Sequence, residues 1–298
     1  MSEDYVTDVS NPRETGRLIR KYGLALKKSL GQNFLIDPNI LRHIVAAAEL
    51  DQSKGALEIG PGAGALTQQL AKKAGRVVAV EIDRRLQPVL AETLAPYPNA
   101  TVVFSDVLKL DLRELWNDHF RDCSRVSVVA NLPYYATTPI VMKLLMAGLK
   151  FEYIVVMVQR EVAERMLAKP GGKDYGSLSV AVQYYCVPER IAIVPPTVFV
   201  PQPNVDSAVI RLKLRDEPPA RVRDESFFFE LVRACFAQRR KTIANNLTRA
   251  FFAKAGKSVA ESLLNRCGIE PGRRGETLTI EQFAALSDAV FGYLHDTR

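Results

Sequence analysis

The segment ANLPYYATTP, residues 130–139, contains groups that could position a nucleobase amine for methylation. An adenine exocyclic amine is a poor nucleophile because its lone pair is delocalised into the ring. The side-chain oxygen of Asn131 and the carbonyl of Leu132 could accept its N–H hydrogens and draw the nitrogen toward tetrahedral geometry. Pro133 biases Leu132 toward an extended backbone, which could aim that carbonyl outward. Tyr134 could stack on the base and stabilise a transient cation through its ring face.

This segment needs no strong general base, because a methylated amine becomes acidic and water can take its proton. Its main contribution would be to hold the amine, the methyl group and a sulfonium in line. The alternative interpretation is an ordinary proline turn with one polar and one aromatic residue, which is common in loops. The position of the segment, at the end of a predicted fourth strand and downstream of a glycine loop, favours the chemical interpretation.

The glycine loop lies in LEIGPGAGALT, residues 57–67, at a predicted strand-to-helix turn. Gly60, Gly62 and Gly64 can adopt positive φ and allow a ligand to approach the backbone. Glu81 ends the next predicted strand, about 20 residues further on, where an acidic residue can accept hydrogen bonds from ribose hydroxyls. This spacing indicates a cofactor that contains a nucleoside.

The glycine order favours S-adenosylmethionine over NAD as that cofactor. The dinucleotide fingerprint is G-x-G-x-x-G, whereas this loop reads G-P-G-A-G. Its proline removes an N–H that a pyrophosphate would require. Because S-adenosylmethionine has no phosphate, that loss does less harm. A tight glycine turn with no ligand is the remaining alternative, and Glu81 counts against it.

Two further residues each have a functional and a structural interpretation. Asp106 follows the third predicted strand at the carboxyl edge of the sheet, where it could accept a hydrogen bond from the cofactor's adenine amine. It could instead cap the next helix, although the context favours the first role. Phe199, held between prolines in TVFVPQP, could stack on a flipped-out base or fill the core, and the sequence favours neither.

These residues are separated by alternating apolar runs and helical stretches. Nearly continuous apolar strands belong to parallel sheets that are buried on both faces, and intervening helices predict a doubly wound α/β domain. A helix is expected over residues 38–50, with Asp37 as its N-cap and Pro38 at its first position. The expected strands are residues 56–60, 77–82, 101–104, 126–130 and 153–158.

The pattern changes after residue 161. Two β-rich runs, 182–187 and 208–214, are expected to close the sheet as an antiparallel pair. Residues 215–226 are polar and contain proline, which is typical of a linker. From Phe227 onward the apolar spacing of three and four predicts a smaller helical domain. We therefore expect a larger domain over 1–215, including a basic N-terminal segment, and a small helical domain over 216–298; the resemblance described below implies that the first is catalytic and the second binds RNA.

Charge is concentrated in two parts of this 298-residue chain, whose formal net charge is +7. Residues 231–260 contain seven Lys or Arg and no Asp or Glu, and residues 13–28 contain six basic residues and one acidic residue. Such segments could contact phosphates or could be solvated helix faces, and charge alone does not decide between them.

Cysteine usage and hydropathy exclude several classes of protein. The four cysteines form no CxxC pair and have no His at metal-ligand spacing, so neither a metal site nor a disulfide framework is expected. Unpaired thiols fit a reducing cytoplasm. The polar, acidic start is no secretory signal, and no apolar run approaches the roughly 20 residues that span a bilayer. We expect a cytoplasmic protein without membrane contact.

Taken in order, the motifs resemble those of the KsgA-type rRNA adenine N6,N6-dimethyltransferases. The resemblance implies a Rossmann-like S-adenosylmethionine-dependent methyltransferase domain and a small all-helical C-terminal domain. It implies dimethylation of two adjacent adenosines near the 3′ end of small-subunit (16S-type) rRNA, within an immature small subunit, by a protein expected to be a monomer. The matching segments span nearly the whole chain and are KKSLGQNFLID, EIGPGAGALT, VVAVEID, NLPYYATTP, QREVAERM, YGSLSV, VFVPQPNVDSAV and FAQRRKTIANNL.

The resemblance also implies roles for single residues. The target adenine would be held by Asn131, Leu132, Pro133 and Tyr134, with Phe199 stacked against it. The basic residues expected on RNA are Arg239, Arg240 and Lys241 in FAQRRKTIANNL, together with Lys27 and Lys28. The implied cofactor contacts are Asn33, Leu35, Gly60, Glu81, Asp106 and Asn131. The chain departs from many members in having Ser105 before Asp106, and the resemblance assigns no role to the residues before Tyr22.

Three alternatives remain. Related enzymes that methylate large-subunit rRNA and confer macrolide resistance usually have NIPY in place of NLPY. A non-catalytic RNA-binding assembly factor could retain the fold, but the intact cofactor residues argue against it. An NAD-dependent oxidoreductase is disfavoured by the glycine spacing and because none of the three His residues lies in a motif.

Overall fold

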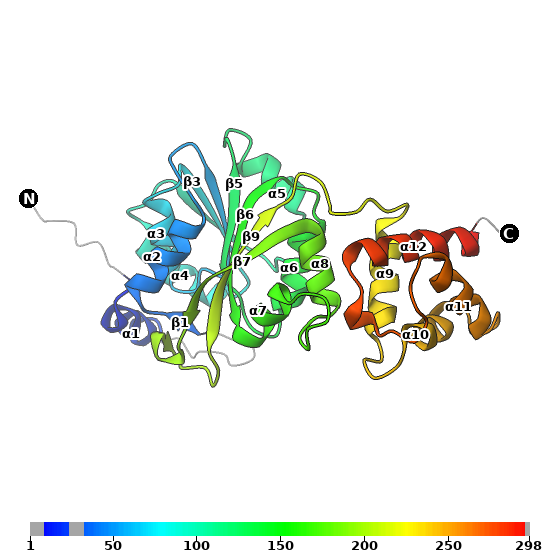
Figure 1. The fold of residues 1–298 in the computed structure, drawn as a ribbon. Helices are drawn as coiled ribbons and strands as arrows, with labels where there is room; N and C mark the ends of the chain where they lie inside the picture. Colours follow the sequence, from blue (N-terminus) through cyan, green and yellow to red (C-terminus); the bar gives the residue numbers. More distant parts are fainter. Residues whose placement is uncertain (1–8, 24–32, 296–298) are drawn as a thin grey trace, which may run out of the picture. The chain divides into compact units, whose positions relative to one another are not determined.

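The computed structural model describes residues 9–23 and 33–295 (Figure 1). The chain forms two compact units. The first contains the residues up to Ala163 together with Pro188–Leu214, and the second contains Glu164–Val187 together with the residues from Arg215 onward. The boundary near residue 215 coincides with the expected linker. In addition, the segment 164–187 groups with the C-terminal helices, which the sequence pattern did not indicate.

The first unit is built on a twisted, mostly parallel sheet. Its strand order is β4-β3-β2-β5-β6-β9-β7. Strands β2 to β6 pair in parallel, and β9 returns antiparallel to β6, with Val156 opposite Ile210. The bounds are β2 Gly55–Ile59, β3 Arg76–Glu81, β4 Ala100–Phe104, β5 Val126–Asn131, β6 Phe151–Gln159, β7 Cys186–Val194 and β9 Ser207–Leu214.

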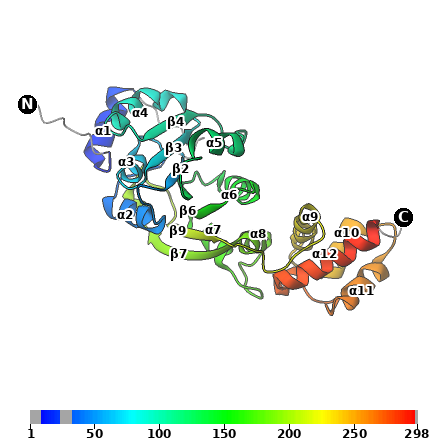
Figure 2. The ribbon, with the colours of Figure 1, turned by 90° about the horizontal axis from the view of Figure 1, so that it is seen from above.

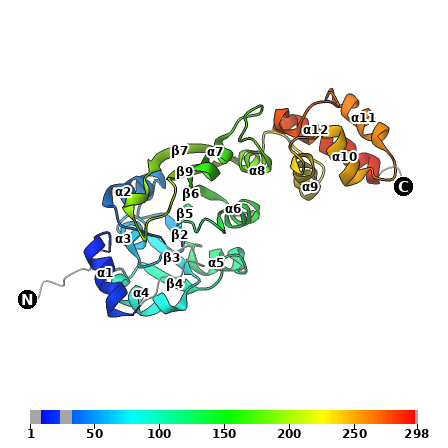
Figure 3. The ribbon, with the colours of Figure 1, turned by 90° about the horizontal axis from the view of Figure 1, so that it is seen from below.

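Helices cover both faces of this sheet, as Figures 2 and 3 show. Helices α2 (Pro38–Ala47) and α3 (Ala65–Ala71) lie on one face, and α5 (Leu112–His119) and α6 (Thr137–Met146) lie on the other. Because the central strands are buried on both faces, their side chains are almost all apolar. The doubly wound α/β fold predicted from the sequence is confirmed.

Helix α2 begins as predicted and ends earlier than predicted. The Asp37 carboxylate accepts the N–H groups of Asn39 and Ile40, at 2.7 and 3.1 Å, and so caps the helix. The helix ends at Ala47, because Glu49 adopts a φ of +47°, which a continuing helix cannot accommodate.

The run 182–187 was expected to be a strand, and this prediction is wrong for most of it. Residues Ser177–Tyr185 form helix α8, and strand β7 begins only at Cys186. A short apolar run does not by itself distinguish a buried helix from a buried strand. Here packing favours the helix, because the rings of Tyr184 and Tyr185 pack against Phe228 and Phe229, with centroids 5.0 and 5.5 Å apart.

The second unit is helical, as predicted. Asp224 caps α9 through the N–H of Phe227 at 2.7 Å. Its core contains the α9 residues Phe228, Leu231 and Val232, which are buried. The helices that follow α8 are α9 Glu225–Phe236, α10 Ile243–Phe251, α11 Lys257–Arg266 and α12 Ile280–His295. In the described part of the chain, no helix combines the length and apolarity needed to cross a bilayer.

Candidate active site

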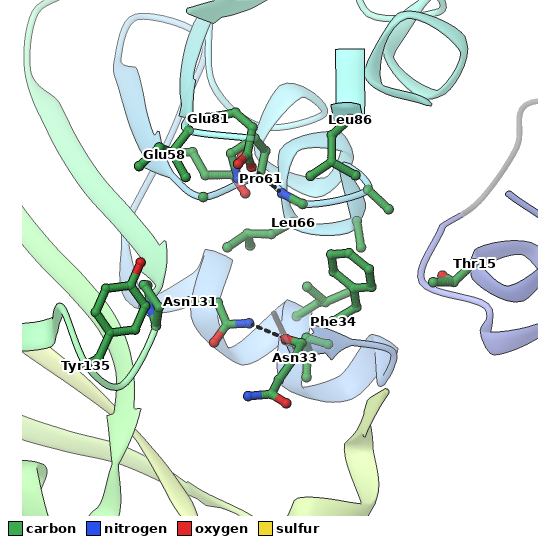
Figure 4. Close-up of a pocket in the computed structure, with 18 residues that line it drawn as sticks. Thr15, Asn33, Phe34, Glu58, Pro61, Leu66, Glu81, Leu86, Asn131 and Tyr135 are labelled. Atoms are coloured by element: carbon green, nitrogen blue, oxygen red, sulfur yellow. Dashed lines mark hydrogen bonds between the residues drawn. The ribbon is translucent and has the colours of Figure 1, made fainter. Parts of the chain in front are cut away.

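A cleft opens at the carboxyl ends of β2, β3 and β5 (Figure 4). On one side of β2 the sheet continues with β3 and β4, and on its other side it continues with β5 and β6. The cleft therefore lies where the strand order reverses. Ligands bind at this position in open α/β sheets. The cleft holds about 830 Å³ of free space, part of it open to solvent. Its walls come from residues 33–35, the glycine turn, Glu81 and the segment after β5.

The glycine turn connects β2 to α3 and has the conformation expected from the sequence. Gly60, Gly62 and Gly64 have φ values of +74°, +59° and +96°. A Cβ on Gly62 would lie 2.7 Å from the Phe34 ring, and one on Gly64 would lie 2.9 Å from the hydroxyl of Thr93. Only glycine combines a positive φ with the absence of a Cβ, so it alone fits these positions. The turn therefore brings backbone directly to the cleft.

Glu81 ends β3 and is 4% exposed. One carboxylate oxygen accepts the Gly62 N–H at 3.2 Å, and the other accepts the Asp83 N–H at 2.8 Å. Burial raises the pKa of Glu81, and these two backbone donors oppose the rise. Glu81 therefore fixes the glycine turn and at the same time lines the cleft.

Glu58 also lines the cleft, and the sequence analysis did not select it. It lies on β2, two residues before Gly60, and is 1% exposed. Its Oε2 atom has no hydrogen-bond partner among the described residues. Burial raises the pKa of Glu58 to about 8, and the nearby charge of Glu81 contributes to the rise. In the sequence, the position of Glu58 in LEIG, two residues before the first glycine of the turn, indicates that it could lie at the cleft.

These acidic residues fit S-adenosylmethionine, which carries positive charge on its sulfonium and on its amino group. A buried carboxylate without a partner is costly, and a cationic ligand offsets that cost. Glu81 and the exposed backbone of the glycine turn suit the nucleoside part of the same molecule.

Asn131, at the end of β5, connects the cofactor side of the cleft with the NLPY segment. Its Nδ2 donates to the backbone carbonyl of Asn33 at 3.0 Å, as drawn in Figure 4. Because a carbonyl only accepts, this bond orients the amide and leaves its oxygen available as an acceptor. Asn33 adjoins β1 (Phe34–Leu35), which is held by antiparallel pairing with β8 (Phe199–Val200). Asn33, Leu35, Gly60, Glu81 and Asn131 thus all line one cleft.

The backbone after Asn131 turns sharply into α6. The Leu132 N–H donates to the carbonyl of Met157 at 3.1 Å, and the Pro133 carbonyl accepts the Ala136 N–H at 3.0 Å. No described residue donates to the Leu132 carbonyl. Pro133 lines the cleft, whereas the Leu132 side chain is buried in the core. Leu132 therefore has only its backbone to offer a ligand.

The two tyrosines of NLPYY are placed differently. The hydroxyl of Tyr134 shares a 2.8 Å hydrogen bond with the buried Ser207 on β9. Burial raises the pKa of Tyr134. Tyr134 does not line the cleft, whereas Tyr135 lines it and is 61% exposed. Tyr135 was not selected from the sequence, although its position next to Tyr134 was a usable signal.

Besides Leu132 and Tyr134, two further predicted residues, Asp106 and Phe199, lie outside the cleft lining. One Asp106 carboxylate oxygen accepts the Leu108 N–H at 2.9 Å and closes a turn. The capping alternative for Asp106 is wrong, because Asp111 caps the next helix. Phe199 is 2% exposed and packs in the core, opposite Leu35 in the β1–β8 pair. The structure therefore favours the core interpretation of Phe199.

The predicted RNA-binding residues also separate into groups. The Arg239 guanidinium donates to the carbonyls of Lys173 and Tyr175, at 2.5 and 3.4 Å. Arg240 and Lys241 are exposed, and no described residue forms an ion pair or hydrogen bond with either side chain. Lys27 and Lys28 lie outside the described residues.

The doubly wound fold and the cleft at its switch point fit an S-adenosylmethionine-dependent methyltransferase. The sequence of residues 23–289 matches the family model for ribosomal RNA adenine dimethylase. The chain belongs to this family, and the enzyme class, the cofactor and adenine dimethylation predicted from the sequence are confirmed at the family level.

Relatives and solved structures agree with this assignment. The chain is 58% identical to the ribosomal RNA small subunit methyltransferase A of Geobacillus sp. (strain WCH70), over 95% of this chain and 98% of that protein. It is also 58% identical to the protein of that name from Bacillus cereus (strain B4264), over 95% and 97%.

Two solved structures are similar in fold over most of their length. A dimethyladenosine transferase from Plasmodium falciparum superposes with a TM-score of 0.72 at 26% identity, over 85% of this chain and 95% of that one. The 23S rRNA methyltransferase ErmE superposes with a TM-score of 0.63 at 30% identity, over 87% and 100%.

Proposed function

We propose that this protein transfers methyl groups from S-adenosylmethionine to the N6 amines of two adjacent adenosines near the 3′ end of small-subunit rRNA, during small-subunit biogenesis. The observation that carries the proposal is the position of Asn131. It lines the same cleft as the glycine turn and begins the NLPY segment, so one side chain adjoins both the cofactor residues and the base-binding corner.

The cofactor is held by residues on three sides of the cleft. Glu81 accepts the ribose hydroxyls, and the glycine turn allows close contact at Gly60. Asn33 and Leu35 supply the wall from β1, and Asp106 receives the adenine amine at the sheet edge. Glu58 balances the positive charge of the methionine part of the cofactor. When bound, S-adenosylmethionine supplies an electrophilic methyl group.

The acceptor adenine is held by the segment that follows β5. The Asn131 side-chain oxygen and the Leu132 carbonyl accept the two amine hydrogens, so the nitrogen lone pair is freed toward the methyl group. Pro133 fixes the turn. Tyr135, exposed at the cleft, provides a ring face for the base, while Tyr134 supports the turn through Ser207 and retains its predicted role beside the base. Stacking by Phe199 requires its side chain to leave the core.

RNA is contacted by exposed cations of the second unit. Arg240 and Lys241 are available for phosphates because neither is paired within the described residues. Lys27 and Lys28 are assigned to RNA from the sequence alone, and Arg239 serves mainly to hold the 173–175 loop. We propose a monomer, made up of a catalytic and a helical RNA-binding part, that acts on the immature small subunit in the cytoplasm.

The small subunit is preferred over the large subunit for two reasons. The chain has NLPY in place of NIPY, and the relatives that match it over nearly their full length carry small-subunit names. The likeness to a 23S rRNA methyltransferase keeps the large subunit as the second candidate.

The test supplies purified protein with labelled S-adenosylmethionine and either small or large subunits from cells that lack the methylations. Label is expected in small-subunit rRNA, as N6,N6-dimethyladenosine in two neighbouring residues. Label confined to large-subunit rRNA would favour the resistance-type enzyme. Cofactor binding without transfer to either subunit would favour an assembly factor.

A further inference from the structure

Residues 9–22 precede the part of the chain that matches the family model, yet they pack against the proposed cofactor site. Helix α1 (Pro12–Lys21) packs beside the glycine turn, because its Leu18 lies in one apolar cluster with Ala63. Leu18 and Val9 are fully buried in a small apolar cluster with Ala63, which belongs to the glycine turn, and Val89, which lies on α4 (Gln87–Leu94). The position of Ala63 therefore depends in part on α1.

Hydrogen bonds extend this packing into the turn. The Val9 N–H donates to the buried side chain of Gln68 at 3.2 Å, and Gln68 donates to the carbonyl of Thr93 at 2.8 Å. The Thr93 hydroxyl in turn donates to the carbonyl of Ala63 at 3.0 Å. The Thr15 hydroxyl closes the segment on itself by donating to the carbonyl of Val9 at 2.9 Å. A continuous polar network thus joins the N-terminal segment to the cofactor turn.

Thr15 brings α1 to the cleft itself, because it is one of the lining residues. Figure 4 shows Thr15 on the opposite side of the cleft from Tyr135, beyond Phe34. Among the labelled lining residues, Phe34 and Leu86 lie on the same side of the cleft as Thr15 (Figure 4). Helix α1 therefore supplies part of the wall that faces away from the base-binding corner.

One carboxylate on α4 fastens this helix. Glu92 accepts from Arg17 at 3.2 Å, from Lys21 at 2.5 Å and from the Tyr22 hydroxyl at 2.5 Å. These donors hold the pKa of Glu92 at about 2, so it stays ionised throughout the physiological range. Two of the N-terminal basic residues that the sequence offered for phosphates are therefore committed to this contact.

We propose that α1 is a wall of the S-adenosylmethionine site and that Glu92 is a positioning residue which keeps the wall closed. Glu92 touches neither cofactor nor RNA; it acts through α1, Thr15 and the glycine turn. This inference rests on the proposed cofactor site. It predicts that loosening the Glu92 contact weakens cofactor binding and leaves methyl transfer at saturating cofactor unchanged.

The experiment compares the full-length wild type with Glu92→Lys, Glu92→Gln and the double variant Lys21→Glu/Glu92→Lys. Glu261→Lys is the matched control, because Glu261 forms an exposed ion pair with Lys257 at 3.2 Å on α11, in the other unit. Calorimetry gives the Kd for S-adenosylmethionine, and steady-state assays give KM and kcat for each substrate. Thermal melts show which variants fold.

We expect Glu92→Lys to raise the Kd and KM for S-adenosylmethionine by about fivefold, the affinity equivalent of one exposed ion-pair network. Glu92→Gln raises them less, the double variant recovers part of the loss, and kcat and the KM for RNA stay at wild-type values. The control variant binds the cofactor like the wild type.

Wild-type cofactor affinity in a folded Glu92→Lys variant would overturn the proposal, as would an equal loss in the Glu261→Lys control. If Glu92→Lys fails to fold, Glu92→Gln decides by the same criterion. A wild-type protein that binds no S-adenosylmethionine would contradict the proposed function instead, so the two failures are distinguishable.

Discussion

Glu58 and Glu81 line the same cleft and differ in what they are bonded to. Glu81 is satisfied by two backbone donors, whereas Glu58 keeps one buried oxygen without a partner among the described residues. A protein retains such a group at a cost in stability, and ligand sites are where this cost is commonly found. From this difference we assign two roles to Glu81, shaping the glycine turn and binding the cofactor. Glu58 is assigned the role of balancing the positive charge of the cofactor.

Substituting Glu58 tests this assignment through pH. The pKa of Glu58 in the folded protein is about 8, above its ordinary value of 4.5, so the folded protein holds this proton more tightly than the unfolded chain. The stabilisation that comes from the bound proton is complete below pH 4.5 and is lost as pH rises through 8. Glu58→Gln should therefore melt at a higher temperature than the wild type at pH 8, and the difference should shrink toward pH 5. Melting curves of the ligand-free proteins measure this.

The same substitution should have the opposite effect on the cofactor. Ionisation of Glu58 favours a cationic ligand, so wild-type affinity for S-adenosylmethionine should rise as pH approaches 8, and Glu58→Gln should bind more weakly with a flatter profile. Calorimetric titration between pH 6 and about 9 measures both. Matching profiles in the two proteins would show that Glu58 carries no charge toward the cofactor.

The neighbouring tyrosines of the NLPYY segment should separate folding from catalysis. Tyr134→Phe removes a partly buried hydrogen bond to Ser207 and should cost about 1 kcal/mol of unfolding free energy with most activity retained. Tyr135→Ala should lower kcat/KM for RNA and leave the Kd for S-adenosylmethionine unchanged. Denaturant unfolding and steady-state kinetics on both variants measure this. A large loss of cofactor affinity in Tyr135→Ala would count against base contact.

At the scale of elements, the strands of the central sheet could be predicted from the sequence because burial on both faces leaves a continuous apolar run. The glycine turn could be predicted because its three glycines have no substitute at positive φ. The helix at Ser177–Tyr185 could not be predicted from the sequence, because aromatic packing on α9 decides whether this segment forms a helix or a strand. The direction in which Tyr134 and Phe199 point could not be predicted either, because it also depends on tertiary contacts. Tyr134 and Phe199 face inward through contacts with Ser207 and the β1–β8 pair, which no local pattern encodes.

The glycine turn gives the prediction that belongs to this scale. Gly62→Ala places a residue at a φ of +59° and a Cβ 2.7 Å from the Phe34 ring. The backbone strain alone is about 1–2 kcal/mol. We expect a lower melting temperature together with weaker S-adenosylmethionine binding, both measured on the purified variant. Gly171→Ala is the control, since its φ is +85° but no atom lies near its Cβ and it is remote in sequence from the turn; it should lose stability without losing cofactor affinity.

For the whole molecule, binding RNA and binding the cofactor are assigned to different parts of the chain. All the described residues that line the cleft belong to the first unit, whereas Arg240 and Lys241 belong to the second. Replacing both with Ala should weaken RNA binding and reduce the salt slope by about 1.4–1.8, the contribution of two phosphate contacts. Filter binding at several salt concentrations measures this, and the Kd for S-adenosylmethionine should not change.

Arg239→Ala provides the contrast within the same segment. Its guanidinium donates to two backbone carbonyls, so its loss should lower the melting temperature more than it changes the salt slope. A salt slope unchanged in the Arg240/Lys241 double variant would mean that these cations lie on a solvated face.

The central claim concerns one cleft that presents a methyl group to an adenine amine at Asn131. The most direct measurement is an experimental structure of the protein with S-adenosylmethionine bound. The account predicts that the ribose lies at Glu81, the positively charged methionine part lies near Glu58, and the methyl group faces the Asn131 side-chain oxygen and the Leu132 carbonyl. A cofactor bound in another cavity, or one whose methyl group points away from Asn131, would contradict it.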